Sequence, residues 1–168
     1  VKTKVNAPAT WAESIAAAKK QANSEMQRTC LPVVSQVIKA KTAAVPFTAD
    51  VTGLEEMVLY TWGTVDGTND DQAVWANAKL IAADGSSIWL NDLKDTFKNT
   101  GSGRLRFNEN AKGQTVIMRG KQYRRTIMAN ANSQIVVPLN KRYVRFEAEI
   151  GLENRSSSGT AVFRLQGI

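Results

Sequence analysis

The sequence predicts a mainly β protein, a β-sandwich of the jelly-roll type, preceded by a helical segment. Between about residues 46 and 168, short apolar stretches recur at regular spacing, and Gly-containing turns separate them. Many short strands with such turns are typical of sandwiches and jelly rolls. Strands do not alternate with helices, which argues against a nucleotide-binding α/β fold. We therefore expect a helical linker or docking arm over residues 1–45 and a β-sandwich over residues 46–168.

The helical segment is predicted from a cap and an apolar stripe. Thr10 and Glu13 have the spacing of a capping box, in which the Thr hydroxyl accepts from the Glu amide and the carboxylate reaches back. Residues at helical spacing then form one apolar stripe: Trp11, Ile15, Ala18, Ala22 and Met26. Pro32 ends or restarts the helix. Four apolar residues after it predict a second, short helix: Val33, Val34, Val37 and Ile38.

The strands of the sandwich are predicted from their apolar patterns, at residues 57–62, 73–82, 87–90, 116–118, 122–128, 134–139, 143–152 and 161–165. A turn at 83–86 places Gly85 where a positive φ is needed. Residues 119–121 form a tight hairpin turn. The stretch 143–152 alternates strictly, which indicates a strand with one buried and one solvated face. Its predicted inward residues are Val144, Phe146, Ala148 and Ile150. Residues 161–165 repeat the pattern, with Arg164 and Gln166 predicted to face outward.

The composition excludes most catalytic and zinc sites. The chain has no histidine, so a Ser-His-Asp triad or a Cys-His pair cannot form. Its one cysteine, Cys30, cannot form an internal disulfide and cannot by itself build a zinc site. Any catalysis would have to rest on carboxylates, Lys or Tyr, and no such set can be assembled. We therefore expect a protein that binds rather than an enzyme.

The formal net charge of +7 raises the possibility of an anionic partner. A basic cluster consists of Arg119, Lys121, Arg124 and Arg125. It is open to three interpretations: phosphate contacts, a solvated strand face, or contact with an acidic sugar through the planar guanidinium fork. Few aromatic residues accompany it, and no nucleic-acid-binding motif is present. Binding of nucleic acid or another polyanion therefore stays the alternative function.

The oxygen-rich loop at residues 66–71 is a candidate Ca²⁺ site. Its candidate ligands are Asp66, Asn69, Asp70 and Asp71. Ca²⁺ takes several oxygen ligands on flexible loops, although the spacing here is not that of an EF-hand. The alternative is a solvated turn.

Tryptophan and amide residues provide candidates for sugar binding. Two of Trp62, Trp75 and Trp89 are expected in the core, and Trp62, beside the acidic loop, is the candidate for stacking on a sugar ring. Asn130 and Asn132 lie between two strands, where their amides could satisfy sugar hydroxyls in pairs or could cap turn amides.

Several segments together resemble the NPCBM family of carbohydrate-binding modules. They are Gly120-Lys-Gln-Tyr123, residues 126–135, Leu139, Tyr143-Val-Arg-Phe146, Glu149-Ile-Gly-Leu152 and residues 159–167. A second piece, Asp71-Gln-Ala-Val-Trp75 with the strand before it, is similar to a segment that usually lies at the C-terminal end in relatives. The domain therefore resembles a circularly permuted member of the family.

The resemblance implies a galactose-binding-type β-sandwich that binds sugar without catalysis, sometimes with a structural calcium. It also implies an extracytoplasmic location and attachment to a glycoside hydrolase or a similar protein. The expected partners are a galactose-type or acidic glycan and a catalytic domain of the same chain, but neither nucleic acid nor a membrane. Asn130 and Gln72 stand where the family has histidines. This leaves open whether the domain binds a different sugar or only braces its catalytic neighbour.

Overall fold

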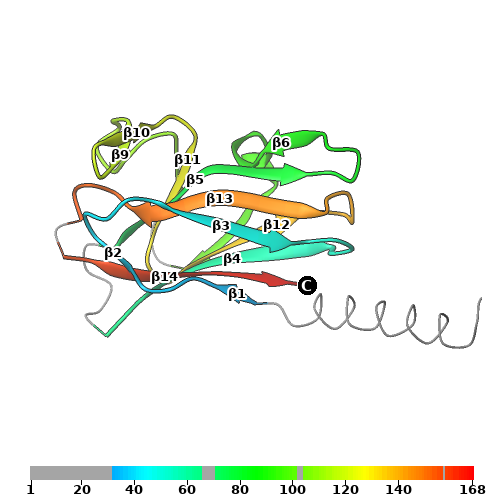
Figure 1. The fold of residues 1–168 in the computed structure, drawn as a ribbon, viewed down its shortest axis with the longest axis horizontal. Helices are drawn as coiled ribbons and strands as arrows, with labels where there is room; N and C mark the ends of the chain where they lie inside the picture. The colour runs from blue at the N-terminus through cyan, green and yellow to red at the C-terminus, as the bar shows by residue number, and fades with distance from the viewer. Residues whose placement is uncertain (1–31, 66–70, 102–103, 157) are drawn as a thin grey trace, which may run out of the picture. The chain divides into compact units, whose positions relative to one another are not determined.

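The computed structural model describes residues 32–65, 71–101, 104–156 and 158–168, which fold into two stacked antiparallel sheets (Figure 1). Sheet A has the spatial order β1 (Val33–Val34), β14 (Thr160–Gly167), β4 (Glu56–Gly63), β12 (Ser133–Pro138) and β7 (Lys98–Gly101). A further strand, β2 (Ile38–Lys39), also pairs with β14.

Sheet B has the order β3 (Val45–Asp50), β13 (Arg145–Leu152), β5 (Gln72–Ile81), β11 (Thr126–Asn130) and β8 (Arg106–Phe107). Strand β6 (Ser87–Trp89) also pairs with β5, and the 3-10 helix η1 (Leu90–Thr96) follows it. A separate hairpin consists of β9 (Val116–Met118) and β10 (Lys121–Tyr123). The predicted mainly β sandwich is confirmed. Of the part of the chain described here, no helix is long and apolar enough to cross a bilayer.

The N-terminal boundary of the sandwich differs from the prediction. The compact unit begins at Pro32 rather than at residue 46, and two short strands, Val33–Val34 and Ile38–Lys39, replace the expected second helix. Val33 pairs with Leu165, and the Ser35 amide donates to the carbonyl of Phe163 at 2.8 Å. β-branched residues suit a strand, and here they complete the edge beside β14. The first predicted helix lies outside the described residues.

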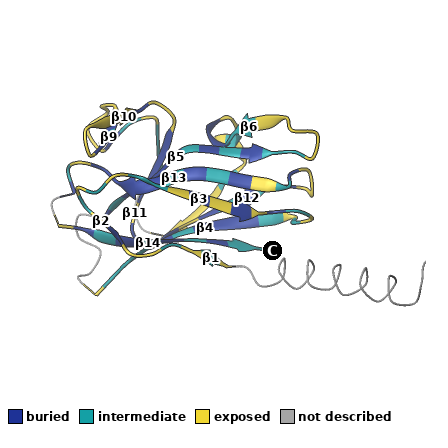
Figure 2. Cartoon of the chain, viewed as in Figure 1, coloured by how far each residue is buried: buried dark blue, intermediate teal, exposed yellow. Residues whose placement is uncertain are grey.

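An aromatic cluster centred on Trp75 joins the two sheets. The indole is fully buried, and its ring centroid lies 5.0 Å from that of Phe163 on sheet A. On its own sheet, Phe47 and Phe146 approach it edge-on at 5.3 and 5.9 Å. Edge-to-face rings at these distances add to the stabilisation that burial provides. Buried residues lie along the strands of both sheets (Figure 2).

The hairpin β9–β10 covers part of the outer face of sheet B. Arg119 and Gly120 have φ values of 44° and 79°, so the predicted tight turn has the positive φ at both positions that a two-residue hairpin loop favours. Val116, Met118 and Tyr123 pack on apolar residues of the sheet in one buried cluster. A Cβ on Gly151 would lie 2.6 Å from the Met118 sulfur, so the Met118 side chain would have to shift if any other residue stood there.

Glu149 ties the hairpin to the sheet. Its carboxylate accepts from the Asn77 side-chain amide at 2.7 Å, and from Lys121 and the Tyr123 hydroxyl at 3.3 Å each. Partial burial by itself raises the pKa of Glu149, but the hydrogen bonds from Asn77 and Lys121 outweigh it and lower the pKa below the usual 4.5. A depressed pKa of this kind stabilises the fold only while the carboxylate is ionised.

We predict that Glu149→Gln lowers the free energy of unfolding at neutral pH, and that the difference from the parent protein shrinks below pH 4.5. The contribution is fully present above the unfolded-state pKa and is lost as the pH falls through the lower folded-state pKa. Urea unfolding over a pH series measures it. The control is Glu55→Gln, because Glu55 forms an exposed ion pair with Lys141. A difference for Glu149→Gln that stays constant with pH would contradict the prediction.

Candidate functional site

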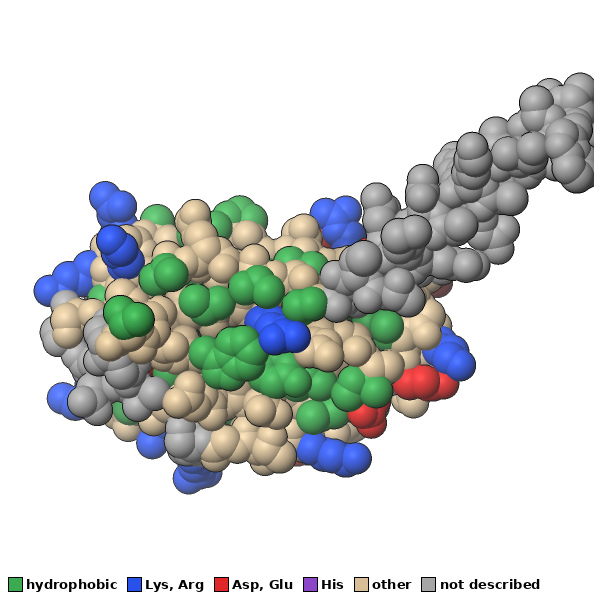
Figure 3. Space-filling model, turned by 90° about the horizontal axis from the view of Figure 1, so that it is seen from below, with side chains coloured by type: hydrophobic (Ala, Val, Ile, Leu, Met, Phe, Trp, Pro, Cys, Tyr) green, Lys and Arg blue, Asp and Glu red, His purple; other side chains and the backbone are tan. Residues whose placement is uncertain are grey.

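The outer face of sheet A carries two aromatic side chains side by side. Along β4, Leu59 and Thr61 point into the core, and alternation therefore turns Tyr60 and Trp62 outward. Both are half-buried, and their ring centroids lie 5.2 Å apart with the planes tilted by 43°. Apolar residues on the same face of neighbouring strands extend this surface: Val34, Val136 and Val162. Hydrophobic side chains gather visibly on this side (Figure 3).

Arg164 lies at the centre of the surface. It pairs with Tyr60 across the β14–β4 ladder. Its guanidinium carbon is 5.3 Å from the Trp62 ring centroid and 5.5 Å from that of Tyr60. A guanidinium over an aromatic face is attracted by the ring quadrupole. Its Nη2 donates to Gln166 at 2.7 Å, whereas its buried Nε has no hydrogen-bond partner among the described residues. The arginine therefore holds the two rings and Gln166 in one arrangement.

Amide groups flank the aromatic rings. Gln166 uses its carbonyl oxygen to accept from Arg164, which leaves its NH₂ group as a donor. On the other side, Gln134 pairs with Tyr60 across the β12–β4 ladder, and its side-chain oxygen accepts from Thr100 at 3.4 Å. We call Tyr60, Trp62, Arg164, Gln134 and Gln166 the aromatic platform.

The aromatic platform has the chemistry that binds a ring with one apolar face and polar edges. The half-exposed indole and phenol provide apolar contact, and the amides and the guanidinium provide donors around it. These residues come from three neighbouring strands of one sheet, so the backbone ladders fix their spacing. The residues of the platform therefore have the chemistry to bind a ligand of this kind.

The structure places the predicted sugar-binding residues on two opposite faces. Trp62 lies on the aromatic platform. Asn130 pairs with Gln72, and both share the strand parity of Met128 and Val74, which pack against the hairpin on the outer face of sheet B. These two residues therefore point away from the side on which Trp62 lies.

Asn132 lies in the exposed turn between the two sheets, with a φ of 63°. The turn is fixed on both sides, since the Thr61 hydroxyl bonds that of Ser133 at 2.5 Å and the Ala131 amide donates to Asp71 O at 3.1 Å. Ser133 also pairs with Thr61 in the ladder, so the next residues along, Asn132 and Trp62, lie at the same end of the sheet. Asn132 is therefore the predicted amide that lies nearest in the ladder to the aromatic platform.

The predicted basic cluster does not form a single charged surface. Arg124 is exposed in the turn before β11, at the opposite end of that strand from Asn130, and so does not join the other predicted site residues. Lys121 pairs with Glu149 at 3.3 Å, and the Arg125 guanidinium stacks 4.7 Å from the Trp89 ring centroid. Of the basic residues nearby in sequence, Arg145 pairs with Glu147 at 2.9 Å. This arrangement favours a solvated strand face over phosphate contacts.

The calcium prediction falls mostly outside the described residues. Asp66, Asn69 and Asp70 are not described, and Asp71 is buried at the start of β5. Within the described ranges, no group of three or more His, Cys, Asp or Glu residues is arranged to hold a metal ion. Calcium binding at residues 66–71 therefore stays a prediction.

Comparison with models of protein families assigns the chain to a family. The model of the NPCBM/NEW2 domain matches residues 31–81 and 86–167, which is most of the sequence and nearly all of the sandwich. The chain belongs to the NPCBM family. It is a carbohydrate-binding module, a class that is generally noncatalytic. No curated protein and no solved structure matches the chain.

The extent of the NPCBM match agrees with the structural boundary. The matched region starts at residue 31, next to Pro32, where the compact unit begins. The NPCBM domain thus includes β1 and β2, which lie within the residues predicted as the helical segment. The match does not test the circular permutation, which stays a prediction.

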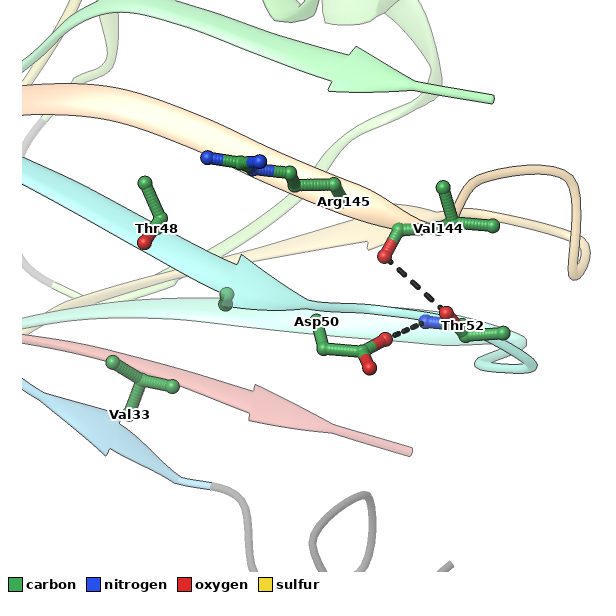
Figure 4. Close-up of a pocket in the computed structure, with 7 residues that line it drawn as sticks. Val33, Thr48, Asp50, Thr52, Val144 and Arg145 are labelled. Carbon is green, nitrogen blue, oxygen red and sulfur yellow. Dashed lines mark hydrogen bonds between the residues drawn. The ribbon is translucent and has the colours of Figure 1, made fainter. Parts of the chain in front are cut away.

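A groove on the edge of this NPCBM domain is the main alternative site. A hollow of about 510 Å³ lies between β1 and β3, and Val33, Thr48, Asp50 and Arg145 line it (Figure 4). Its hydrogen bonds are local: the Thr52 amide donates to Asp50 Oδ1 at 2.8 Å, and the Thr52 hydroxyl donates to the carbonyl of Val144 at 3.3 Å. It has no aromatic ring among its lining residues. The groove therefore lacks the stacking surface that the aromatic platform provides.

Sequence reasoning identified part of the NPCBM platform. It predicted Trp62, and the alternation of residues 161–165 predicted that Arg164 and Gln166 face outward, but it assigned them no role. Gln134 was missed because it joins the surface only through the β4–β12 register. Tyr60 was also missed, although it lies two positions before Trp62 on β4 and alternation places both side chains on one face. The expectation of two core tryptophans was wrong, since Trp75 is fully buried whereas Trp62 and Trp89 are half-buried.

Proposed function

We propose that this NPCBM domain binds a hydroxyl-rich glycan through the aromatic platform. The observation that supports the proposal is the pair of half-exposed rings of Tyr60 and Trp62, with Arg164 between them and amides on both sides. A pyranose ring has an apolar C–H face for the aromatic side chains and hydroxyls at its edges for the amides. The guanidinium adds a fork of donors, which suits galactose-type sugars and also the carboxylate of an acidic sugar.

We also propose that the domain is an accessory module of a larger extracytoplasmic glycan-degrading protein, such as a glycoside hydrolase. The NPCBM family and the resemblance of the motifs support this assignment. A surface on the face of a sheet holds a sugar weakly, and micromolar to millimolar dissociation constants correspond to only about 4–8 kcal/mol. Tethering to a catalytic domain makes such weak binding useful, because it raises the local substrate concentration.

Titration with galactosides and with uronate-containing oligosaccharides tests glycan binding directly. We expect saturable chemical-shift changes, and we expect Trp62→Ala to weaken binding at least about tenfold, which is about 1.4 kcal/mol. The matched control is Trp89→Ala, because Trp89 is also half-buried and also stacks with an arginine, but on the outer side of sheet B. Equal affinity of both variants and the parent protein would remove the aromatic platform from the site.

The same titration separates a glycan from a nucleic acid or another polyanion. Affinity for a polyanion falls steeply as the salt concentration rises, because binding releases condensed counterions. We expect binding of a neutral galactoside to change little over the same salt range. A steep salt dependence together with binding of an unrelated polyanion would favour the alternative function.

We propose that the calcium ion predicted for residues 66–71 has a structural role and stabilises the fold. Bound calcium stabilises the folded state, and more strongly the higher its concentration is above the dissociation constant, because the unfolded chain lacks the site. Removal of calcium with a chelator should therefore lower the melting temperature, and its re-addition should restore it. Asp66→Asn should reduce this response, whereas an unchanged melting temperature on chelation would reject the site.

A further inference from the structure

A polar pocket lies on the other side of the sandwich from the aromatic platform. The pocket has a volume of about 520 Å³, and its walls include Asn110, Gln114, Ile117, Glu153 and Arg155. Glu153 directly follows β13, and its amide donates to the carbonyl of Gln72 at 3.0 Å. The pocket therefore adjoins the end of β5 where the predicted residues Gln72 and Asn130 pair.

Glu153 is a buried carboxylate with unused acceptor capacity. Only 2% of its surface is exposed. Its Oε1 accepts from the Asn110 side-chain amide at 3.3 Å, and its Oε2 accepts from the amide of Arg155 at 2.9 Å. A carboxylate can accept about four hydrogen bonds, and these two are its partners among the described residues. A ligand hydroxyl in the pocket could donate to the remaining positions.

Asn110 is held in one orientation. Its side-chain oxygen accepts from the amides of Lys112 and Gln114 at 2.9 and 3.1 Å. Its NH₂ group must therefore face Glu153 and the pocket, and one of the two N–H donors stays available after the bond to the carboxylate. Like Glu153, Asn110 is almost completely buried, with 2% of its surface exposed. The pair is thus a rigid combination of acceptor and donor.

Arg155 adds a second donor. One guanidinium nitrogen, Nη2, donates to Gln114, whereas the other, Nη1, is buried and has no hydrogen-bond partner within the described ranges. A buried N–H without a partner costs free energy, which an acceptor supplied by a ligand would recover. The pocket therefore presents an acceptor and donors on neighbouring groups.

We propose that this pocket binds the terminal residue of a glycan through two adjacent hydroxyls. One hydroxyl donates to Glu153, and its neighbour accepts from Arg155 and Asn110. The opposite charges of Glu153 and Arg155 disfavour both a simple anion and a simple cation, but they suit a neutral diol. Ile117 supplies an apolar contact for the C–H face of the sugar. This assignment rests on the proposed carbohydrate-binding function and adds a second site with a different preference.

The two sites on opposite sides give the module two valences. The aromatic platform is an open surface that suits the length of a chain, whereas the pocket has walls that suit a chain end. Because the platform is on the outer face of sheet A and the pocket is on the hairpin side of sheet B, a short oligosaccharide cannot contact both. Simultaneous occupation therefore links two glycan chains, or two segments of one long chain.

Site-resolved NMR of the folded domain tests the pocket with methyl β-galactoside as the probe. The Ile117 methyl group reports on the pocket, and the indole N–H of Trp62 reports on the platform. We expect saturable chemical-shift changes at Ile117. The affinity derived from them should be at least tenfold weaker in Arg155→Met and in Glu153→Gln. The Trp62 shifts should persist in both variants. Lys112→Ala is the control, because Lys112 is exposed and its hydrogen bond to Asn110 comes from the main-chain amide, which the substitution keeps.

The outcomes distinguish failure of the pocket from failure of the proposed function. Shifts at Trp62 without shifts at Ile117, or Ile117 shifts that are equal in Arg155→Met and the parent protein, would overturn the pocket but leave the platform. No chemical-shift change at either Ile117 or Trp62 would overturn both proposals. If Glu153→Gln fails to fold, Arg155→Met still decides, because Arg155 is only half-buried.

Discussion

The packing of Trp75 between the two sheets is the constraint on which the rest of the structure depends. Its contacts with Phe163 of sheet A and with Phe47 and Phe146 of sheet B fix which face of each strand is internal. Because side chains alternate along a strand, the inward position of Phe163 also fixes the outward position of Arg164. The same reasoning on β4 turns Tyr60 and Trp62 outward. The buried aromatic cluster and the surface platform therefore have one structural cause.

The two outer faces of the sandwich are used differently. On sheet B, the β9–β10 hairpin buries Val74, Ala76 and Met128 in a second small core. On sheet A, half-exposed rings, a guanidinium and amides occupy the corresponding positions. Large apolar groups at a surface are costly to leave in water unless they contact something, and such patches mark interaction sites. For an NPCBM domain, a glycan is the partner whose chemistry fits this combination of rings and donors.

Features that depend on the pattern within one strand or turn could be predicted from the sequence. Features that depend on which strands pair, and in which register, could not. The inward positions of Phe146, Ala148 and Ile150 and the turn around Gly120 were predicted correctly, because each is local. The predicted start of that strand was wrong, since β13 begins at Arg145 and Val144 is only half-buried. Residues 33–38 were predicted as helix, whereas Val33–Val34 and Ile38–Lys39 pair with β14. This pairing joins residues more than 120 positions apart in the chain, so the local sequence does not reveal it. Register also decides that Gln72 and Asn130 point away from Trp62. A one-residue shift in either ladder would have placed them differently, and no local pattern reveals it.

We propose that sugar recognition by this NPCBM domain uses the open face of sheet A rather than an edge groove. A crystal structure of the domain with a bound oligosaccharide tests it most directly. We predict a sugar ring stacked on Trp62, with its hydroxyls within hydrogen-bonding distance of Arg164 and of Gln134 or Gln166. An oligosaccharide bound in the groove between β1 and β3, with the face of sheet A empty, would contradict the claim.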